Sequence, residues 1–98
     1  MFLLLSRYIK PLEDVDGLLP EHRAFLDRHY AAGHFILSGP LEPRTGGAIL
    51  AVAATRDEVA AILDEDPFVR DGVSEYDIIE VRLTRNIPAL NEVLGGSP

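Results

Sequence analysis

Cysteine and tryptophan are absent from these 98 residues, and methionine occurs only once. Without cysteine the chain has no disulfide, no thiol nucleophile and no thiolate ligand for a metal. Long apolar runs are also missing, because the first one, Phe2–Leu5, ends at Ser6 and Arg7. It is far shorter than the ~20 apolar residues of a membrane-spanning helix and too short for a signal peptide. We therefore expect a cytoplasmic protein with no membrane partner.

Basic residues are scarce as well. Nine lysines and arginines stand against sixteen acidic residues, which gives a formal net charge of −7. Such a charge repels a phosphate backbone, and no basic stripe with interleaved aromatic residues offsets it. The sequence therefore argues against nucleic-acid binding.

A hairpin occupies the centre of the chain. Two apolar runs, 34–38 and 48–53, flank a stretch that contains two prolines and three of the eight glycines. Turn residues concentrated between two strand-length runs are typical of antiparallel strands joined by a loop. Further strands are predicted over 2–9 and 74–83.

Two helices are predicted, one on each side of the hairpin. The first begins at Leu19 or Pro20 and continues to residue 32, because positions 22, 25, 26, 29 and 30 follow helical spacing. The second begins after Thr55 and ends before Pro67, since Thr55 and Glu58 match a capping box. Residues 12–18 are expected to form a loop, and 66–72 a compact connector.

The order β-α-β-β-α-β predicts an α+β fold of the ferredoxin-like type. Residues 1–83 would form this single domain. Residues 84–98 would form a tail with a short helical turn around 88–94 and disorder beyond it. Right-handed crossovers place both helices on one face of a four-stranded antiparallel sheet.

The other face of this sheet should be polar if water covers it, but the strand residues of both parities are mainly apolar. Leu3 and Leu5 alternate with Phe2 and Leu4, for example. An exposed apolar sheet of this size marks a partner surface. We infer a homodimer in which the two sheets pack together.

His22 is the strongest candidate for chemistry, because an imidazole is a proton donor and acceptor near neutral pH. It lies in the first turn of a helix, on the apolar stripe. The alternative is a buried histidine that only fills the core. Asp66 becomes relevant if the two helices bring it near His22, since a carboxylate orients an imidazole and raises its basicity; otherwise it only ends a helix.

Candidate ligand contacts lie at the ends of the strands. Ser38, Gly39 and Pro40 offer a hydroxyl and backbone groups, and Arg7 and Tyr8 suit an anionic or aromatic ligand. No metal site is predicted, because His22 and a second histidine seven residues later lie about 10 Å apart along a helix. The glycine pair at 46–47 precedes a strand, which is the wrong context for a nucleotide loop, so no cofactor is predicted.

Four motifs together resemble the YciI-like (YCII-related) family: Glu21-His22-x-x-Phe25-Leu26, Gly33-x-Phe35-x-Leu37-Ser38-Gly39-Pro40, Gly46-Gly47-Ala48-Ile49 and Asp66-Pro67-Phe68-x-x-x-Gly72-Val73. The resemblance covers about residues 1–83. It implies a dimeric α+β barrel, similar to muconolactone-isomerase-like enzymes, and a cleft with a histidine and an aspartate as an acid–base pair. These roles fall on His22 and Asp66, and Phe68 in the same motif joins the candidate ligand contacts.

Three interpretations of function remain open. The first is a small enzyme without cofactor, of the isomerase or lyase type (such as a dehydrochlorinase), in which His22 moves a proton on a cyclic or lactone-like substrate. The second is a module that binds a small ligand in the same cleft without turnover. The third is a structural dimeric domain in which His22 belongs to the core.

Overall fold

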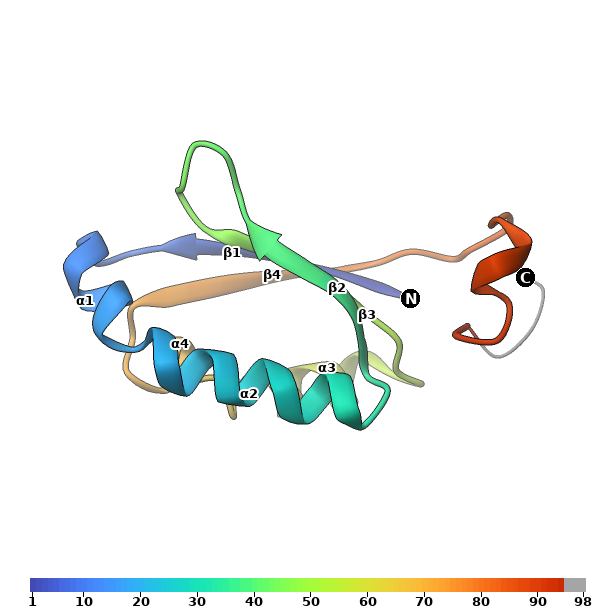
Figure 1. Ribbon diagram of the computed structural model, residues 1–98, viewed down its shortest axis with the longest axis horizontal. Helices are drawn as coiled ribbons and strands as arrows, with labels where there is room; N and C mark the ends of the chain where they lie inside the picture. Colours follow the sequence, from blue (N-terminus) through green and yellow to red (C-terminus); the bar gives the residue numbers. More distant parts are fainter. Residues whose placement is uncertain (95–98) are drawn as a thin grey trace.

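A four-stranded antiparallel sheet carries all the long helices on one of its faces (Figure 1). This computed structural model describes residues 1–94. The strands are β1 (Phe2–Tyr8), β2 (Phe35–Pro40), β3 (Gly47–Ala51) and β4 (Ser74–Glu80), and their order in the sheet is β2-β3-β1-β4. The helices are α1 (Leu12–Gly17), α2 (Leu19–Ala31), α3 (Arg56–Leu63) and α4 (Pro67–Arg70). The predicted ferredoxin-like α+β fold is confirmed.

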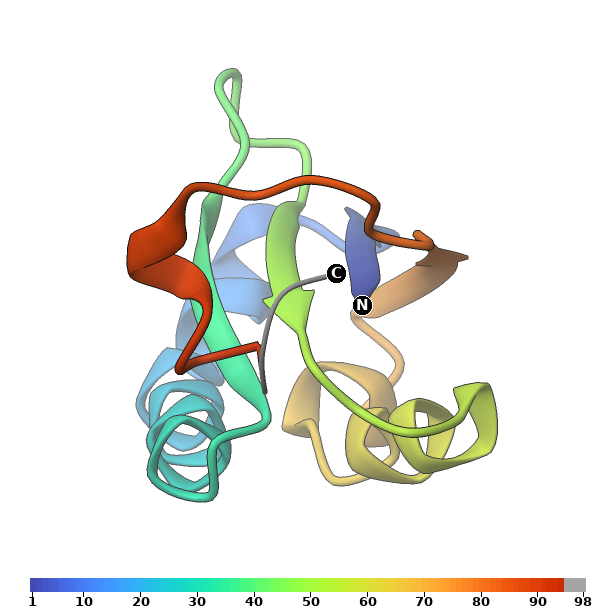
Figure 2. The same cartoon turned by 90° about the vertical axis from the view of Figure 1, so that its right-hand side faces the viewer.

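The core lies between the sheet and the helices, and β1 contributes two of its largest side chains from alternate positions. Phe2 and Leu4 are at most 1% exposed, and they pack with Phe25 of α2 and Val59 of α3. Figure 2 shows α2 below β2, with α3 and α4 on the side of β1 and β4. On this face of the sheet, the start of α2 meets α4.

Local signals in the sequence explain most helix boundaries. Helix α2 begins at Leu19 as predicted, with Pro20 in its first turn, where a missing N–H leaves no partner unsatisfied. Thr55 caps α3 by accepting a hydrogen bond from the Glu58 backbone N–H at 3.1 Å. Glu58 in turn accepts from the backbone N–H of Ala54 at 2.8 Å, one residue before the cap. Thr55 therefore caps the helix as predicted, and Glu58 reaches back one residue further than in the standard capping box.

Several predicted elements differ from the structure in kind or in extent. Within the predicted loop 12–18, Leu12–Gly17 form a helix, because Pro11 precedes it, two acidic residues favour its positive end and Val15 is fully buried. The connector 66–72 contains the short helix α4, which Asp66 caps. The last strand ends at Glu80, so residues 81–83 already belong to the segment that extends beyond the end of the sheet (Figure 1).

The tail contains a short 3-10 helix, Pro88–Leu90, inside the range predicted for a helical turn. The disorder expected at the end of the chain falls on residues 95–98, which lie outside the described part. Within residues 1–94, none of the helices is both long and apolar enough to cross a membrane.

Candidate acid–base site

His22 meets Asp66 where the start of α2 faces the start of α4. The Nδ1 atom of His22 lies 2.8 Å from Oδ1 of Asp66. The histidine side chain is 14% exposed, while the aspartate side chain is not exposed at all. An ionised carboxylate only accepts hydrogen bonds, so Nδ1 carries the donated proton and Nε2 is left as the basic nitrogen of the neutral ring. Within residues 1–94, Nε2 has no hydrogen-bond partner.

Two further donors hold the Asp66 carboxylate in place. Oδ1 also accepts the backbone N–H of Phe68 at 3.0 Å, as expected for a residue that caps α4. Oδ2 accepts the Tyr76 hydroxyl from β4 at 2.8 Å. Three donors therefore converge on one buried carboxylate, which satisfies its charge and fixes its direction.

Tyr76 acts as a donor over a wide pH range. Its burial raises the pKa of the phenol far above the usual range, and the adjacent charge of Asp66 raises it further. Both effects favour the neutral, protonated form of the phenol. The hydrogen bond to Asp66 is thus kept at any pH near neutrality.

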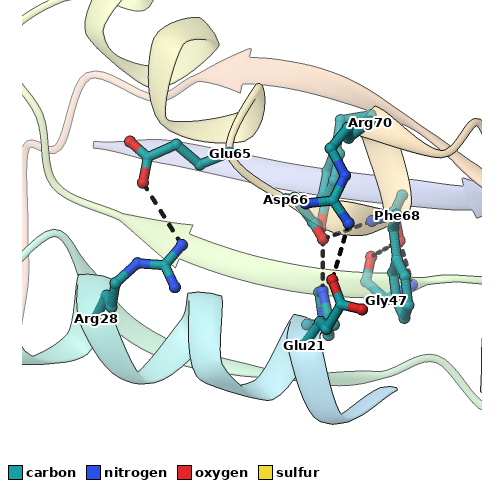
Figure 3. A network of polar contacts seen from close by, with 10 residues as sticks. Glu21, Arg28, Gly47, Glu65, Asp66, Phe68 and Arg70 are labelled. Carbon is teal, nitrogen blue, oxygen red and sulfur yellow. Dashed lines mark hydrogen bonds and ion pairs between the residues drawn. The ribbon is translucent and has the colours of Figure 1, made fainter. Parts of the chain in front are cut away.

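The His22 ring is fixed by packing as well as by its hydrogen bond. It stacks on the ring of Phe68, with 3.9 Å between the centroids and 5° between the planes. Beside this pair, Arg70 of α4 donates to Glu21 of α2 at 2.9 Å (Figure 3). These contacts join the two helix starts on either side of the acid–base pair, so both the ring and the carboxylate are held before any ligand arrives.

A cavity of about 300 Å³ opens in front of His22. Of the predicted ligand contacts, Ser38, Gly39, Pro40, Phe68 and Tyr8 all line it. Asp66 does not line the cavity, because it lies behind the His22 ring with no exposed surface. The residues that line the cavity with them are Ser6, Leu19, Arg23, Leu26, Arg44, Gly47, Ala48, Ile49 and Tyr76.

Arg7 lies elsewhere. Its guanidinium donates to Asp77 at 2.7 Å and to Glu75 at 3.0 Å, and all three side chains are more than half exposed. Successive residues of a strand point to opposite faces, so Arg7 points away from the face that its neighbour Tyr8 shares with the cavity. The structure therefore does not bring Arg7 together with the other candidates.

Sequence reasoning missed several polar residues of the site. Tyr76 lies ten residues from Asp66 in the sequence, and this separation gives no sign of their hydrogen bond. Ser6 accepts a hydrogen bond from the backbone N–H of Gly47 at 2.8 Å, and Arg44 reaches the cavity from the β2–β3 loop. A polar residue on the buried face of an apolar strand was the available signal for Ser6.

The other two histidines form a separate group. His29 donates through Nε2 to Glu65 at 3.0 Å, so its Nδ1 accepts the Nδ1 proton of His34 at 2.9 Å. His29 is buried, as its place on the helical stripe predicted, but Tyr30 of the same stripe is 38% exposed. No cluster of three or more potential metal ligands occurs among residues 1–94.

Comparison with known proteins places this geometry in context. The sequence profile of the YCII-related domain matches residues 1–82. The uncharacterized protein YjpA of Bacillus subtilis (strain 168) is 39% identical over 64 residues, which cover 65% of this chain and 75% of YjpA.

A solved structure has the same fold. It is the 5-chloro-2-hydroxyhydroquinone dehydrochlorinase TftG of Burkholderia phenoliruptrix AC1100, in complex with 2,5-dihydroxybenzoquinone. The two chains superpose with a TM-score of 0.70 at 22% sequence identity, over 84% of this chain and 94% of TftG. At this identity the likeness establishes the fold.

Proposed function

Because this chain belongs to the YCII-related domain family, whose profile matches residues 1–82, we propose that it is a small enzyme in which His22 transfers a proton on a cyclic organic substrate. The reaction is an isomerisation or an elimination. One observation carries the proposal: His22, oriented by Asp66, lines a cavity with its Nε2 free of protein partners among the described residues.

The arrangement supports general base catalysis by His22. Asp66 holds the Nδ1 proton, which keeps Nε2 unprotonated in the neutral ring and stabilises the imidazolium that forms when Nε2 takes a proton. Asp66 is itself fixed by Tyr76 and by the backbone of Phe68, so little reorganisation is needed during the reaction. Asp66 is thus a positioning residue, and His22 is the residue that meets the substrate.

The dehydrochlorinase activity of TftG indicates which reaction to test first. In an elimination of this kind, which proceeds from the keto tautomer of the ring, the base removes a proton from the saturated carbon next to the one that bears chlorine. The electron pair forms a double bond, and chloride leaves with the pair of the broken carbon–chlorine bond. A single histidine supplies the proton transfer that this step requires. In an isomerisation the same nitrogen returns the proton to another carbon.

We further propose that the protein works as a homodimer. Across the uncovered face of the sheet the strand register aligns Leu37, Leu50, Leu3 and Ile79 in one row over all four strands. Leu37 and Ile79 are 52% and 41% exposed. A row of four large aliphatic side chains on one open face favours a second copy as its cover.

Turnover assays with matched variants test the enzymatic proposal. Chlorinated hydroquinones would be followed by chloride release, and unsaturated lactones by absorbance. Replacing the base in His22→Gln should lower kcat/KM by roughly 10²–10⁴-fold. Asp66→Asn should also lower kcat/KM, because the His22 ring loses its orienting partner, and it should alter the pH profile of kcat/KM. Asp27→Asn makes the same change on the exposed surface of α2, away from the site, and should leave kcat/KM unaltered.

Two results would overturn the proposal. One is full activity in a folded His22→Gln variant. The other is binding of cyclic ligands in the cavity without turnover of any substrate in the panel, which would instead support the ligand-binding module.

A further inference from the structure

The charged residues that line the cavity are all basic. Acidic residues outnumber basic ones by sixteen to nine in the chain, yet no carboxylate side chain lines the cavity among residues 1–94. Arg23, Arg44 and His22 are its ionisable nitrogen groups. This local reversal of the overall charge makes the cavity a favourable place for an anion.

Arg44 is held at the cavity by the loop that carries it. The backbone N–H of Tyr8 donates to the carbonyl of Thr45 at 2.9 Å, which ties the loop to β1. The loop is closed by a hydrogen bond from Leu41 N–H to Gly46 C=O at 2.9 Å. A Cβ at Gly46 would lie only 1.8 Å from the Ser6 carbonyl oxygen, so the loop touches β1 as closely as a glycine allows.

The guanidinium of Arg44 has two partners but retains free donors. It lies over the Tyr8 ring at 5.7 Å from the centroid, and it donates through one nitrogen to Asp16 of α1. Asp16 is half exposed and does not line the cavity. Because an arginine has five N–H donors in a rigid fork, one bond to Asp16 leaves others for a ligand.

Arg23 adds a second positive charge beside His22. Among residues 1–94 its guanidinium makes no ion pair within 4.0 Å, although four other arginines of this acidic chain do. The carboxylate of Asp66, which contacts His22, is fully buried and already bound by three donors. An anion in the cavity would therefore meet N–H donors and no carboxylate of the lining.

We propose that the cavity selects a small ring compound in its anionic form, with a carboxylate or enolate oxygen bound by Arg44 and attracted by Arg23. The apolar part of the lining, which includes Leu19, Leu26 and Ile49, receives the ring. This proposal names the class of ligand for the site described under the proposed function, and it rests on the location of that site. It does not require that the protein turn the ligand over.

A pair of isosteric probes tests the selection of charge. Benzoate and benzamide have the same ring and nearly the same shape, and differ in charge. Each is titrated into the full chain, and amide chemical shifts in heteronuclear NMR spectra report binding. Benzoate should bind at least tenfold more tightly than benzamide, and its affinity should fall as salt is added, as expected for a charge-assisted contact.

Variants then assign the effect to Arg44. Since a hydrogen bond to a charged group is worth about 1.5–3 kcal/mol, Arg44→Gln should weaken benzoate binding roughly 10- to 100-fold and leave benzamide within about twofold. Arg23→Gln should weaken benzoate binding less, because it acts through charge at longer range. Arg28→Gln removes the same charge from α2 outside the cavity and should change neither affinity.

Three outcomes would overturn the proposal: equal affinity for the two probes, equal effects of Arg44→Gln and Arg28→Gln, or no binding of benzoate up to its solubility limit. Selective benzoate binding in a protein that turns over no substrate would instead retain this inference and reject the enzymatic function. The two failures are thus distinguishable.

Discussion

Asp66 is a buried charge whose environment satisfies it completely. Its two oxygens accept from a ring nitrogen, a backbone N–H and a phenol, all between 2.8 and 3.0 Å. Removing one partner of such a group costs more than the hydrogen bond alone, because the remaining polar atoms stay buried without a partner. The donors from Phe68 and Tyr76 therefore stabilise the fold and also hold the carboxylate that orients the His22 ring.

Because Tyr76 is buried, we expect the free energy of unfolding to fall at alkaline pH. Burial, together with the charge of Asp66, raises the pKa of its phenol in the folded state, whereas in the unfolded chain the pKa is about 10. Above that pH the unfolded state loses the proton and the folded state keeps it, so the free energy of unfolding should fall by about 1.4 kcal/mol per pH unit. Below that pH the contribution is fully present. Urea unfolding between pH 7 and pH 11 measures this slope.

The matched variants are Tyr76→Phe and Tyr30→Phe. Tyr76→Phe should be less stable at neutral pH, because Asp66 loses a donor, but its stability should depend less on alkaline pH. Tyr30→Phe, at an exposed position, should keep the slope of the wild type. A slope unchanged by Tyr76→Phe would show that another group titrates.

Sequence reasoning identified His22 and Asp66 as the pair to examine, but it could not supply their contact. The two lie 44 residues apart, and only the packing of α2 against α4 brings them together. Tyr76 and Arg44 were missed for the same reason. Each comes from a different element than His22, and the periodicity within one helix or strand says nothing about which other elements pack against it. The His29–His34 bond was missed because it joins α2 to a residue just beyond the end of that helix, before β2 begins.

At the scale of elements, the β2–β3 loop both connects two strands and carries a residue of the cavity. Loops that join two strands usually vary in conformation, but this one is bonded to β1 through Thr45 and closed by Gly46. It delivers Arg44 to the cavity, and the next strand delivers Gly47 to Ser6. The local composition of turn residues predicted a loop here, and it carried no information about the strand on which the loop packs.

Gly46→Ala should destabilise the protein and displace this loop. The added methyl carbon would lie 1.8 Å from a backbone oxygen of β1, and backbone cannot move aside as a flexible side chain can. Overpacking of this kind costs about 1–3 kcal/mol, which urea unfolding would measure. Gly39→Ala is the control, because nothing lies within 4 Å of its added Cβ. Equal stability of the two variants would contradict the close packing of the loop on β1.

Helix α1 shows the limit of local reasoning for elements. Its six residues begin after a proline, with two acidic residues in the first turn and one fully buried valine. An acidic segment with a glycine is equally typical of a loop. Burial of Val15 against Phe68 and Val73 favours the helix over the loop. That burial depends on α4 and on Val73, the residue just before β4, which follow more than fifty residues later.

For the whole molecule, the uncovered sheet face predicts dimerisation. Leu50 lies in the middle of the aliphatic row, paired with Leu3 on one side and Leu37 on the other. A glutamate at its centre would place a charge in the dry interface of two packed sheets, so Leu50→Glu should convert a dimer to a monomer. Size-exclusion chromatography with light scattering measures the mass.

Two variants separate loss of the dimer from loss of the fold. Leu37→Glu changes a side chain that is 52% exposed in the single chain, so it should leave the fold of each subunit intact and still weaken the dimer. Ala61→Glu adds the same charge to an exposed position on the helical side and should not alter the mass. A wild-type chain that runs as a monomer at concentrations of tens of micromolar would contradict the proposal, because an apolar row of this extent would then be covered by something other than a second copy.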